Sequence, residues 1–124
     1  MKLLPFFLIL IILSGCAIPA QAEYRKITPQ EAQAMMLDDV IILDVRNQEE
    51  YAEGHIPDAV LLPDDEVQEH AAGLLADKNQ IILVYCKSGR RSEKAAKELV
   101  EMGYTQVFDF GGIVDWEGEI VYIP

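Results

Sequence analysis

Two stretches of the sequence are apolar at almost every position over the length of a strand. Residues 40–45 are Val-Ile-Ile-Leu-Asp-Val, and residues 80–85 are Gln-Ile-Ile-Leu-Val-Tyr. A strand with one face in water alternates apolar and polar residues, whereas a strand buried on both faces does not alternate. These two stretches therefore predict central strands of a parallel sheet, with helices packed on both of its faces.

Helix signals alternate with these strands. A capping box with proline at the first helical position begins one helix at Thr28, and a second short helix is capped by Asn47 and stopped by Gly54. The other expected elements are strands at 24–27, 59–62 and 106–110, a helix with Val67, Ala71, Leu74 and Leu75 on its inner face, and a helix at 92–102. This alternation predicts one α/β domain over residues 23–124.

The N-terminal residues 1–22 are expected to lie outside this domain. Residues 3–13 form an apolar run too short to span a bilayer, which is typical of an export signal. Leu13–Cys16 resembles a lipobox, which would make Cys16 a lipidated N-terminus behind a short tether. Cleavage after Ala22 is the alternative and would release a soluble protein. We favour the lipobox and therefore expect an exported, membrane-anchored lipoprotein facing the periplasm or the cell exterior.

Charge and cysteine content exclude several classes of function. The formal net charge of −11 argues against nucleic-acid binding, which needs a basic face. Either cleavage leaves Cys86 as the one free thiol, so a structural disulfide is excluded. One cysteine and two distant histidines, His55 and His70, lack the spacing of metal ligands. No large apolar stretch predicts an oligomer, so we expect a monomer.

Cys86 stands where the second apolar strand ends, and cations follow it. In parallel sheets, ligands bind beyond the carboxyl ends of the strands. Gly89 allows a turn with positive φ, so that successive backbone amides can point inward. Lys87, Arg90 and Arg91 add full positive charges, and the next helix adds its N-terminal dipole. All of these effects favour a thiolate over a thiol, so we expect a reactive cysteine.

Several separated motifs in this chain resemble those of one known family. They are Leu43–Arg46, Glu50–Pro57, the loop Cys86–Ser92, and Gly111-Gly112 followed by Trp116. In their order and spacing, residues 24 to about 118 resemble a single rhodanese (sulfurtransferase) domain. The resemblance implies a five-stranded parallel sheet with helices on both faces, in agreement with the elements expected above.

The resemblance also implies a reaction that needs no cofactor. Cys86 would attack the outer sulfur of a small donor such as thiosulfate, hold it as a persulfide, and pass it to a thiol or to cyanide. The persulfide would lie in a loop formed by Lys87, Ser88, Gly89, Arg90, Arg91 and Ser92. Among these residues, Lys87 and Arg90 are expected to attract the anionic donor, and the inward amides to stabilise the persulfide.

Roles for the neighbouring polar residues follow in part from the resemblance. Arg91 either contacts substrate or pairs with a carboxylate such as Asp44 to brace the loop, and these alternatives stay open. Asp44 and Arg46 are expected to support the site structurally. His55 is the obvious candidate for a general base, but it lies in a Gly-His-Ile-Pro turn whose role in the family looks structural.

Two other classes of function remain to be separated from sulfur transfer. Cysteine phosphatases and arsenate reductases also place a thiolate below a helix, in a loop of Cys, five residues, then Arg. Here Ser92 stands six residues after Cys86, and Arg91 stands five after, so the ring is one residue short for a tetrahedral oxyanion. A non-enzymatic persulfide carrier or sulfide-sensing module is the other alternative.

Overall fold

The computed structural model describes residues 23–124, and the predicted export signal with Cys16 lies outside the described residues. The strands are β1 (Arg25–Lys26), β2 (Val40–Asp44), β3 (Val60–Leu61), β4 (Ile81–Cys86) and β5 (Gln106–Gly112). The α-helices are α1 (Pro29–Met35), α2 (Gln48–Glu53), α3 (Val67–Leu74) and α4 (Arg90–Glu101). Two short 3₁₀ helices are η1 (Asp64–Glu66) and η2 (Ile113–Asp115).

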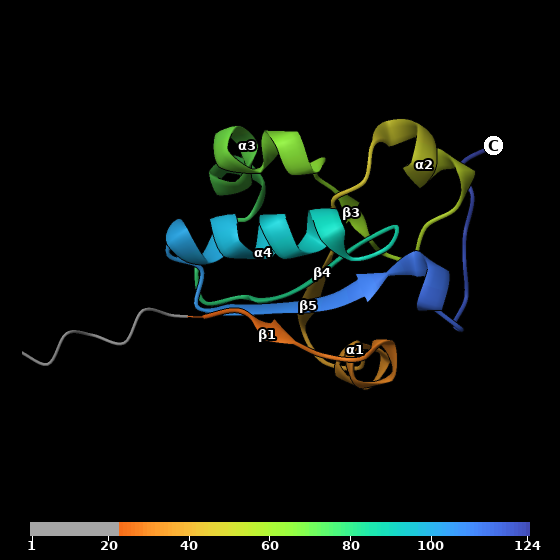
Figure 1. Ribbon diagram of the computed structural model, residues 1–124, viewed down its shortest axis with the longest axis horizontal. Coiled ribbons are helices and arrows are strands. Elements are labelled where there is room, and N and C mark those ends of the chain that lie inside the picture. The colour runs from red at the N-terminus through yellow and green to blue at the C-terminus, as the bar shows by residue number, and fades with distance from the viewer. Residues whose placement is uncertain (1–22) are drawn as a thin grey trace, which may run out of the picture.

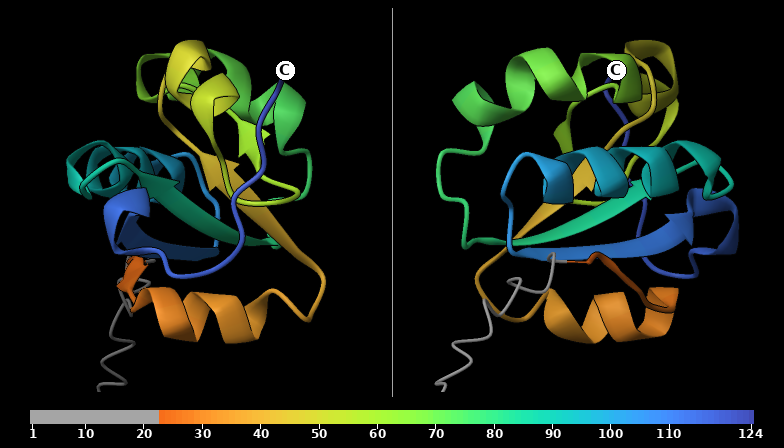
Figure 2. Two further views of the ribbon diagram at one scale, coloured as in Figure 1. Left: turned by 90° about the vertical axis from the view of Figure 1, so that its right-hand side faces the viewer. Right: turned by 60° about the vertical axis from the view of Figure 1, so that its left-hand side comes forward.

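The five strands form one parallel sheet in the order β1-β5-β4-β2-β3. Helix α1 lies on one face of this sheet, and α3 and α4 lie on the other (Figures 1 and 2). The fold class predicted from the sequence is therefore confirmed. Because all strands run in the same direction, their carboxyl ends meet at one edge, where Cys86 ends β4.

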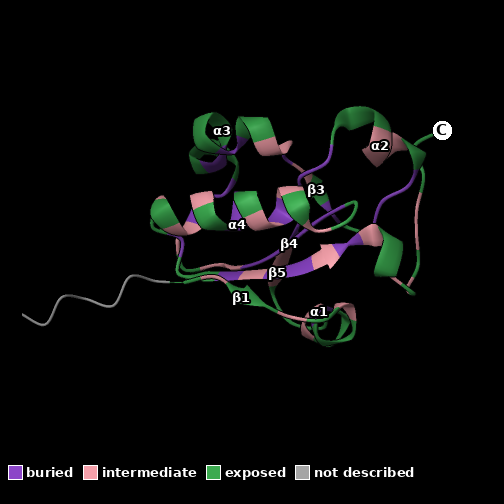
Figure 3. Cartoon of the chain, viewed as in Figure 1, coloured by how far each residue is buried: buried purple, intermediate pink, exposed green. Residues whose placement is uncertain are grey.

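The central strands are apolar throughout because both of their faces are buried (Figure 3). Leu43 and Val84 belong to the core under α3 and α4. Ile42, Leu83 and Tyr85 belong to the core on the side of α1. Successive residues of a strand point to opposite faces, so each strand must supply apolar side chains to both cores.

The helix signals at Thr28 and Asn47 are confirmed as complete capping boxes. The side-chain oxygen of Thr28 accepts from the backbone of Glu31 at 3.1 Å, and that of Asn47 accepts from the backbone of Glu50 at 2.8 Å. Gly54 ends α2 as expected, with φ at +156°. These local contacts fix where α2 lies in the chain, and α2 supplies side chains to the site below.

Two expectations differ from the structure. Leu74, expected on the inner face of α3, is 45% exposed, because α3 packs through the narrow row Val67, Ala71 and Leu75. Helix α4 begins at Arg90, two residues earlier than expected, since Gly89 with φ at +105° serves as its N-cap. The loop after Cys86 is therefore shorter than predicted, and Ser92 lies within the first turn of the helix.

The C-terminal segment packs against α2 and the turn that follows it. His55 and Val121 exchange two backbone hydrogen bonds of 2.9 Å, and the N–H of Ile123 donates to the carbonyl of Ala52 at 3.1 Å. This segment holds the far end of α2 beside the sheet. Within residues 23–124, no helix has the length and apolar character needed to cross a membrane.

Candidate active site

The Cys86 thiol is buried and receives a backbone hydrogen bond from its own loop. Its residue is 1% exposed, and the N–H of Gly89 donates to Sγ at 3.0 Å. Within residues 23–124, Cys86 is not part of a disulfide. Gly89 has the positive φ that the sequence predicts for this turn. One donor is thus already aimed at the atom that would carry negative charge.

Helix α4 points its N-terminus at the same place. Its N-cap, Gly89, provides no side-chain cap, so the first-turn amides keep their hydrogen-bonding capacity. The buried hydroxyl of Ser92 donates to the carbonyl of Gly89 at 3.1 Å and lies 3.5 Å from Sγ of Cys86. The helix end therefore adds positive potential and a hydroxyl beside the thiol.

The cysteine loop packs closely against the end of β5. Cys86 pairs in register with Gly112, and the N–H of Val114 donates to the carbonyl of Lys87 at 3.2 Å. A Cβ atom at position 112 would collide with that carbonyl of Lys87. This approach explains physically why a glycine stands at the second position of the Gly111-Gly112 pair.

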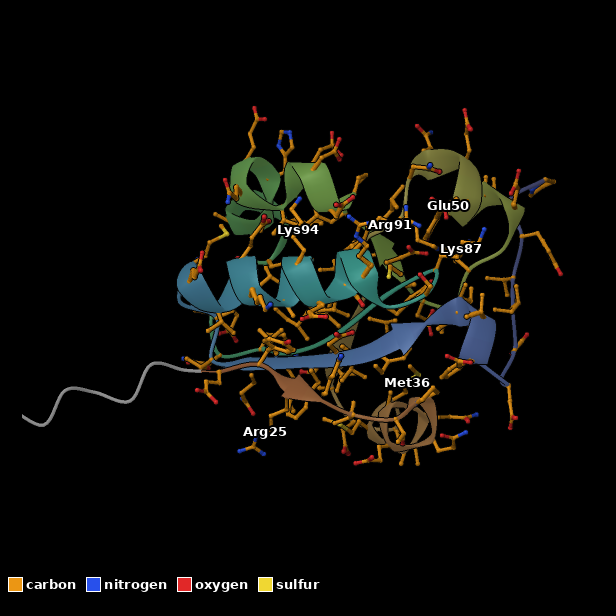
Figure 4. The ribbon with its side chains drawn as sticks, in the orientation of Figure 1. Arg25, Met36, Glu50, Lys87, Arg91 and Lys94 are labelled. Atoms are coloured by element: carbon orange, nitrogen blue, oxygen red, sulfur yellow. The ribbon has the colours of Figure 1, made fainter. Side chains whose placement is uncertain are left out.

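Arg91 is paired with a carboxylate, but the partner is Glu50. The two guanidinium nitrogens donate to the two carboxylate oxygens at 2.7 and 2.9 Å, linking the first turn of α4 to α2 (Figure 4). Of the two alternatives left open for Arg91, the structure shows the pairing with a carboxylate. Asp44, given as an example of such a carboxylate, is not the partner, because it accepts hydrogen bonds from Arg46 and Tyr85. The hydrogen bonds that Glu50 accepts from Arg91 lower the pKa of Glu50 from 4.5 to about 2.

Asp44, Arg46 and Tyr85 form a buried polar cluster beside the site. The Arg46 side chain donates to Asp44 through Nη2 at 2.7 Å and through Nε at 3.0 Å. The Tyr85 hydroxyl donates to Asp44 at 2.7 Å and accepts from the N–H of Ile56 at 3.1 Å. Burial raises the pKa of Tyr85 far above its usual value. None of these contacts involves the cysteine loop.

The cations of the loop separate in space. Lys87 is exposed and lines a cleft of about 250 Å³ between α2 and η2. Arg90 is also exposed, but it lines a different hollow along the outer face of α4, together with Glu93 and Lys94. Ser88 is exposed at the tip of the loop. A shared contact of Lys87 and Arg90 with substrate stays a prediction, and Lys87 is the one in the cleft.

His55 is held by contacts outside the cysteine loop. Its Nδ1 lies 2.7 Å from the carbonyl of Tyr51, and its ring stacks on the Tyr51 ring with centroids 3.7 Å apart. Its backbone pairs with Val121. These contacts match the structural role expected for this turn. Among residues 23–124, no group of three potential ligands could hold a metal ion.

Sequence reasoning did not identify Glu50 or Tyr85 in or beside the site, nor Glu53, which lines the same cleft as Lys87. The capping pattern identifies Glu50 only as a helix-capping residue, and its partner Arg91 lies 41 positions away. Tyr85 is an apolar strand residue by pattern, and its hydroxyl partner Asp44 is equally distant in the chain. No local signal links such pairs, because the sheet topology alone brings them together.

Comparisons with known proteins agree with this geometry. The rhodanese-like domain family matches residues 28–119. Thiosulfate sulfurtransferase PspE of Escherichia coli is 44% identical over 73 residues, which cover 59% of this chain and 70% of that protein. Thiosulfate sulfurtransferase GlpE of Coxiella burnetii is 38% identical over 96 residues, covering 76% of this chain and 88% of that protein.

Solved structures show the same fold. A structure described as rhodanese with anions from E. coli matches with a TM-score of 0.63 at 40% identity, covering 66% of this chain and 96% of that one. A rhodanese-related protein from Thermoplasma volcanium matches with a TM-score of 0.71 at 27% identity, covering 82% of this chain and all of that one. The chain therefore belongs to the rhodanese-like domain family.

Proposed function

We propose that this chain is a sulfurtransferase that moves sulfane sulfur from thiosulfate or a similar donor to a thiophilic acceptor through a persulfide on Cys86. The observation that carries the proposal is the Gly89 N–H aimed at Sγ from 3.0 Å, at the uncapped N-terminus of α4. Two relatives named as thiosulfate sulfurtransferases support the same reaction class.

The loading step forms one sulfur–sulfur bond and breaks another. The Cys86 thiolate attacks the outer sulfur of thiosulfate, the bond between the two donor sulfurs breaks, and sulfite leaves with the electron pair. The product, a persulfide, carries negative charge on its outer sulfur. The N–H of Gly89, which already faces the sulfur, stabilises this charge without reorganisation, which is how preorganised donors lower a barrier. Lys87, in the cleft beside the loop, attracts the anionic donor.

The remaining charged residues position the loop in this proposal. Glu50 neutralises Arg91 and ties the start of α4 to α2. The buried pair of Asp44 and Arg46 supports the strand next to β4. A bidentate pair holds a fixed geometry better than a single contact, so the loop keeps its shape while the sulfur changes between thiolate and persulfide.

A mass measurement tests the proposal directly. The full chain is incubated with thiosulfate, freed of excess donor and weighed. The expected result is a gain of one sulfur atom that dithiothreitol reverses and that Cys86→Ser abolishes. Glu49→Gln, a change on the exposed side of α2 and outside the cysteine loop, is the control for handling and folding.

Other outcomes of this measurement distinguish the other functions. Turnover of an aryl phosphate without a sulfur adduct would refute sulfur transfer in favour of a cysteine phosphatase. An adduct that neither cyanide nor any thiol removes would indicate a carrier or sensor instead of an enzyme.

We also propose that the protein is exported and anchored in a membrane by lipid on Cys16. The sequence of residues 13–16 supports this proposal, with cleavage after Ala22 as the alternative. Accumulation of the precursor under globomycin, together with release from membranes by detergent only, is the expected result. A soluble mature protein that starts at Glu23 would contradict it.

A further inference from the structure

The cleft that contains Lys87 has walls from four parts of the chain, one of which is Arg46 just after β2. Glu50, Glu53 and Gly54 come from α2 and its end, Ile113 and Val114 come from η2, and Lys87 directly follows the cysteine. The carbonyl of Lys87 is tied to the N–H of Val114, so the loop and η2 hold a fixed spacing. The cleft therefore has one wall made by the loop that carries the proposed nucleophile.

Two of the four charged residues that line this cleft are already neutralised. Arg46, at 5% exposure, is paired with Asp44. Glu50 is paired with Arg91. Lys87 and Glu53 remain, both exposed and neither in a salt bridge within residues 23–124. The free charges of the cleft are thus one ammonium group and one carboxylate, with apolar side chains between the loop and η2.

On the basis of the proposed function, we infer that this cleft binds the sulfur acceptor and selects a small zwitterionic thiol of the amino-acid type. Lys87 binds the carboxylate of the acceptor, and Glu53 binds its ammonium group. The thiol is then delivered to the loop that carries Cys86. Ile113 and Val114 contact the carbon atoms of the acceptor.

The size and charge of the cleft argue for this class over others. Its volume of about 250 Å³ lies below the range of about 300–1,000 Å³ typical of drug-sized ligands, so it suits a molecule as small as one amino acid. A dianion such as the donor thiosulfate would be attracted by Lys87 but would leave the carboxylate of Glu53 without a partner. A cationic thiol would be attracted by Glu53 and repelled by Lys87. Only a ligand with both charges satisfies both free groups.

The transfer step is balanced without any further reactant. The acceptor thiolate attacks the outer sulfur of the Cys86 persulfide. A new sulfur–sulfur bond forms in the acceptor, the sulfur–sulfur bond at Cys86 breaks, and Cys86 leaves as a thiolate with the bonding pair. The acceptor thiol loses its proton on becoming a thiolate, and the negatively charged outer sulfur takes up one proton, so the acceptor leaves as a neutral persulfide.

Single-turnover kinetics with three probes test the inference. The full chain is loaded with excess thiosulfate, desalted, checked by mass for the sulfur adduct, and mixed with L-cysteine, 3-mercaptopropionate or cysteamine. The probes carry both charges, the carboxylate only, or the ammonium only. Each rate is compared within one probe between the parent and the variants Glu53→Gln and Lys87→Gln. Glu49→Gln, on the exposed side of α2 and outside the cleft, is the matched control.

The expected result is a crossed pattern. Glu53→Gln slows discharge to L-cysteine and cysteamine by about two- to fivefold, the range of a solvent-exposed ion pair, and does not slow discharge to 3-mercaptopropionate. Lys87→Gln slows L-cysteine and 3-mercaptopropionate but not cysteamine. Equal effects on all three probes, or no effect of Glu53→Gln, would overturn the inference. Absence of the adduct before any probe is added would refute the proposed function instead.

Discussion

Replacing Glu50 by Gln isolates the contribution of the ion pair between α2 and α4. Gln keeps the shape of the side chain and can still complete the capping box with Asn47, so the helix cap survives. The change removes the negative charge and replaces one of the two oxygens that accept from Arg91 with an NH2 group, which cannot accept a hydrogen bond. Any loss of stability therefore reports on the ion pair as a whole, its charge and one of its hydrogen bonds together.

The magnitude follows from the pKa of Glu50, which is lowered from 4.5 to about 2. At about 1.4 kcal/mol for each pKa unit, this difference sets an upper limit of about 3–4 kcal/mol. The side chains of Arg91 and Glu50 are 30% and 23% exposed, so solvent screens part of the interaction. A fully exposed ion pair contributes at most about 1 kcal/mol. Because this pair is only partly exposed, we expect Glu50→Gln to lower the free energy of unfolding by about 1–2 kcal/mol.

The sign of the pH dependence follows from the lowered pKa. A carboxyl whose pKa is lowered by folding stabilises the protein fully above its unfolded pKa of 4.5 and loses that contribution as the pH falls toward 2. Urea denaturation from pH 7 to pH 2.5 measures the difference between parent and Glu50→Gln. This difference should be largest at pH 7 and shrink below about pH 4.5. A difference that stays constant with pH, or an equal effect of Glu49→Gln, would refute the reasoning.

Three further predictions, tested with four substitutions, concern other features of the structure. Gly112→Ala should lower thiosulfate–cyanide turnover by about a hundredfold, because displacement of the cysteine loop misplaces the reacting atoms; a parent-like rate would contradict the close approach. Asp44→Asn should cost about 3–5 kcal/mol in urea denaturation, since it leaves Arg46 buried without its counter-charge, and a cost below about 1 kcal/mol would oppose this. Leu75→Ala should cost about 2–5 kcal/mol and Leu74→Ala less than about 0.5 kcal/mol in the same assay; equal costs would contradict the burial assigned to α3.

The parallel sheet was predictable because its signals are local. Two strands that are apolar on both faces, and two capping boxes at Thr28 and Asn47, each lie within a few residues of the chain. The position of Cys86 at a strand end follows from the same pattern. These features need no knowledge of which strand neighbours which.

The partners of the charged side chains were not predictable in the same way. Arg91 has several carboxylates within reach in principle, and the choice of Glu50 depends on how α2 packs beside α4. Asp44 is excluded as a partner by Arg46 and Tyr85, and Tyr85 lies on a neighbouring strand. The early start of α4 depends on the φ angle of Gly89. The sequence shows that a glycine can adopt many values of φ, but it does not show which value Gly89 adopts.

The sheet order has a consequence for when reactivity arises during folding. Strand β1 pairs only with β5, and the cysteine loop is closed by Gly112 and Val114 at the far end of β5. These pairings are distant in the chain, so their loop-closure entropy delays them relative to local helices. A chain that has not docked β5 has neither a completed edge nor a closed cysteine loop. The docking of β5 should therefore both complete the site and bury the Cys86 thiol, which protects the thiol from oxidants.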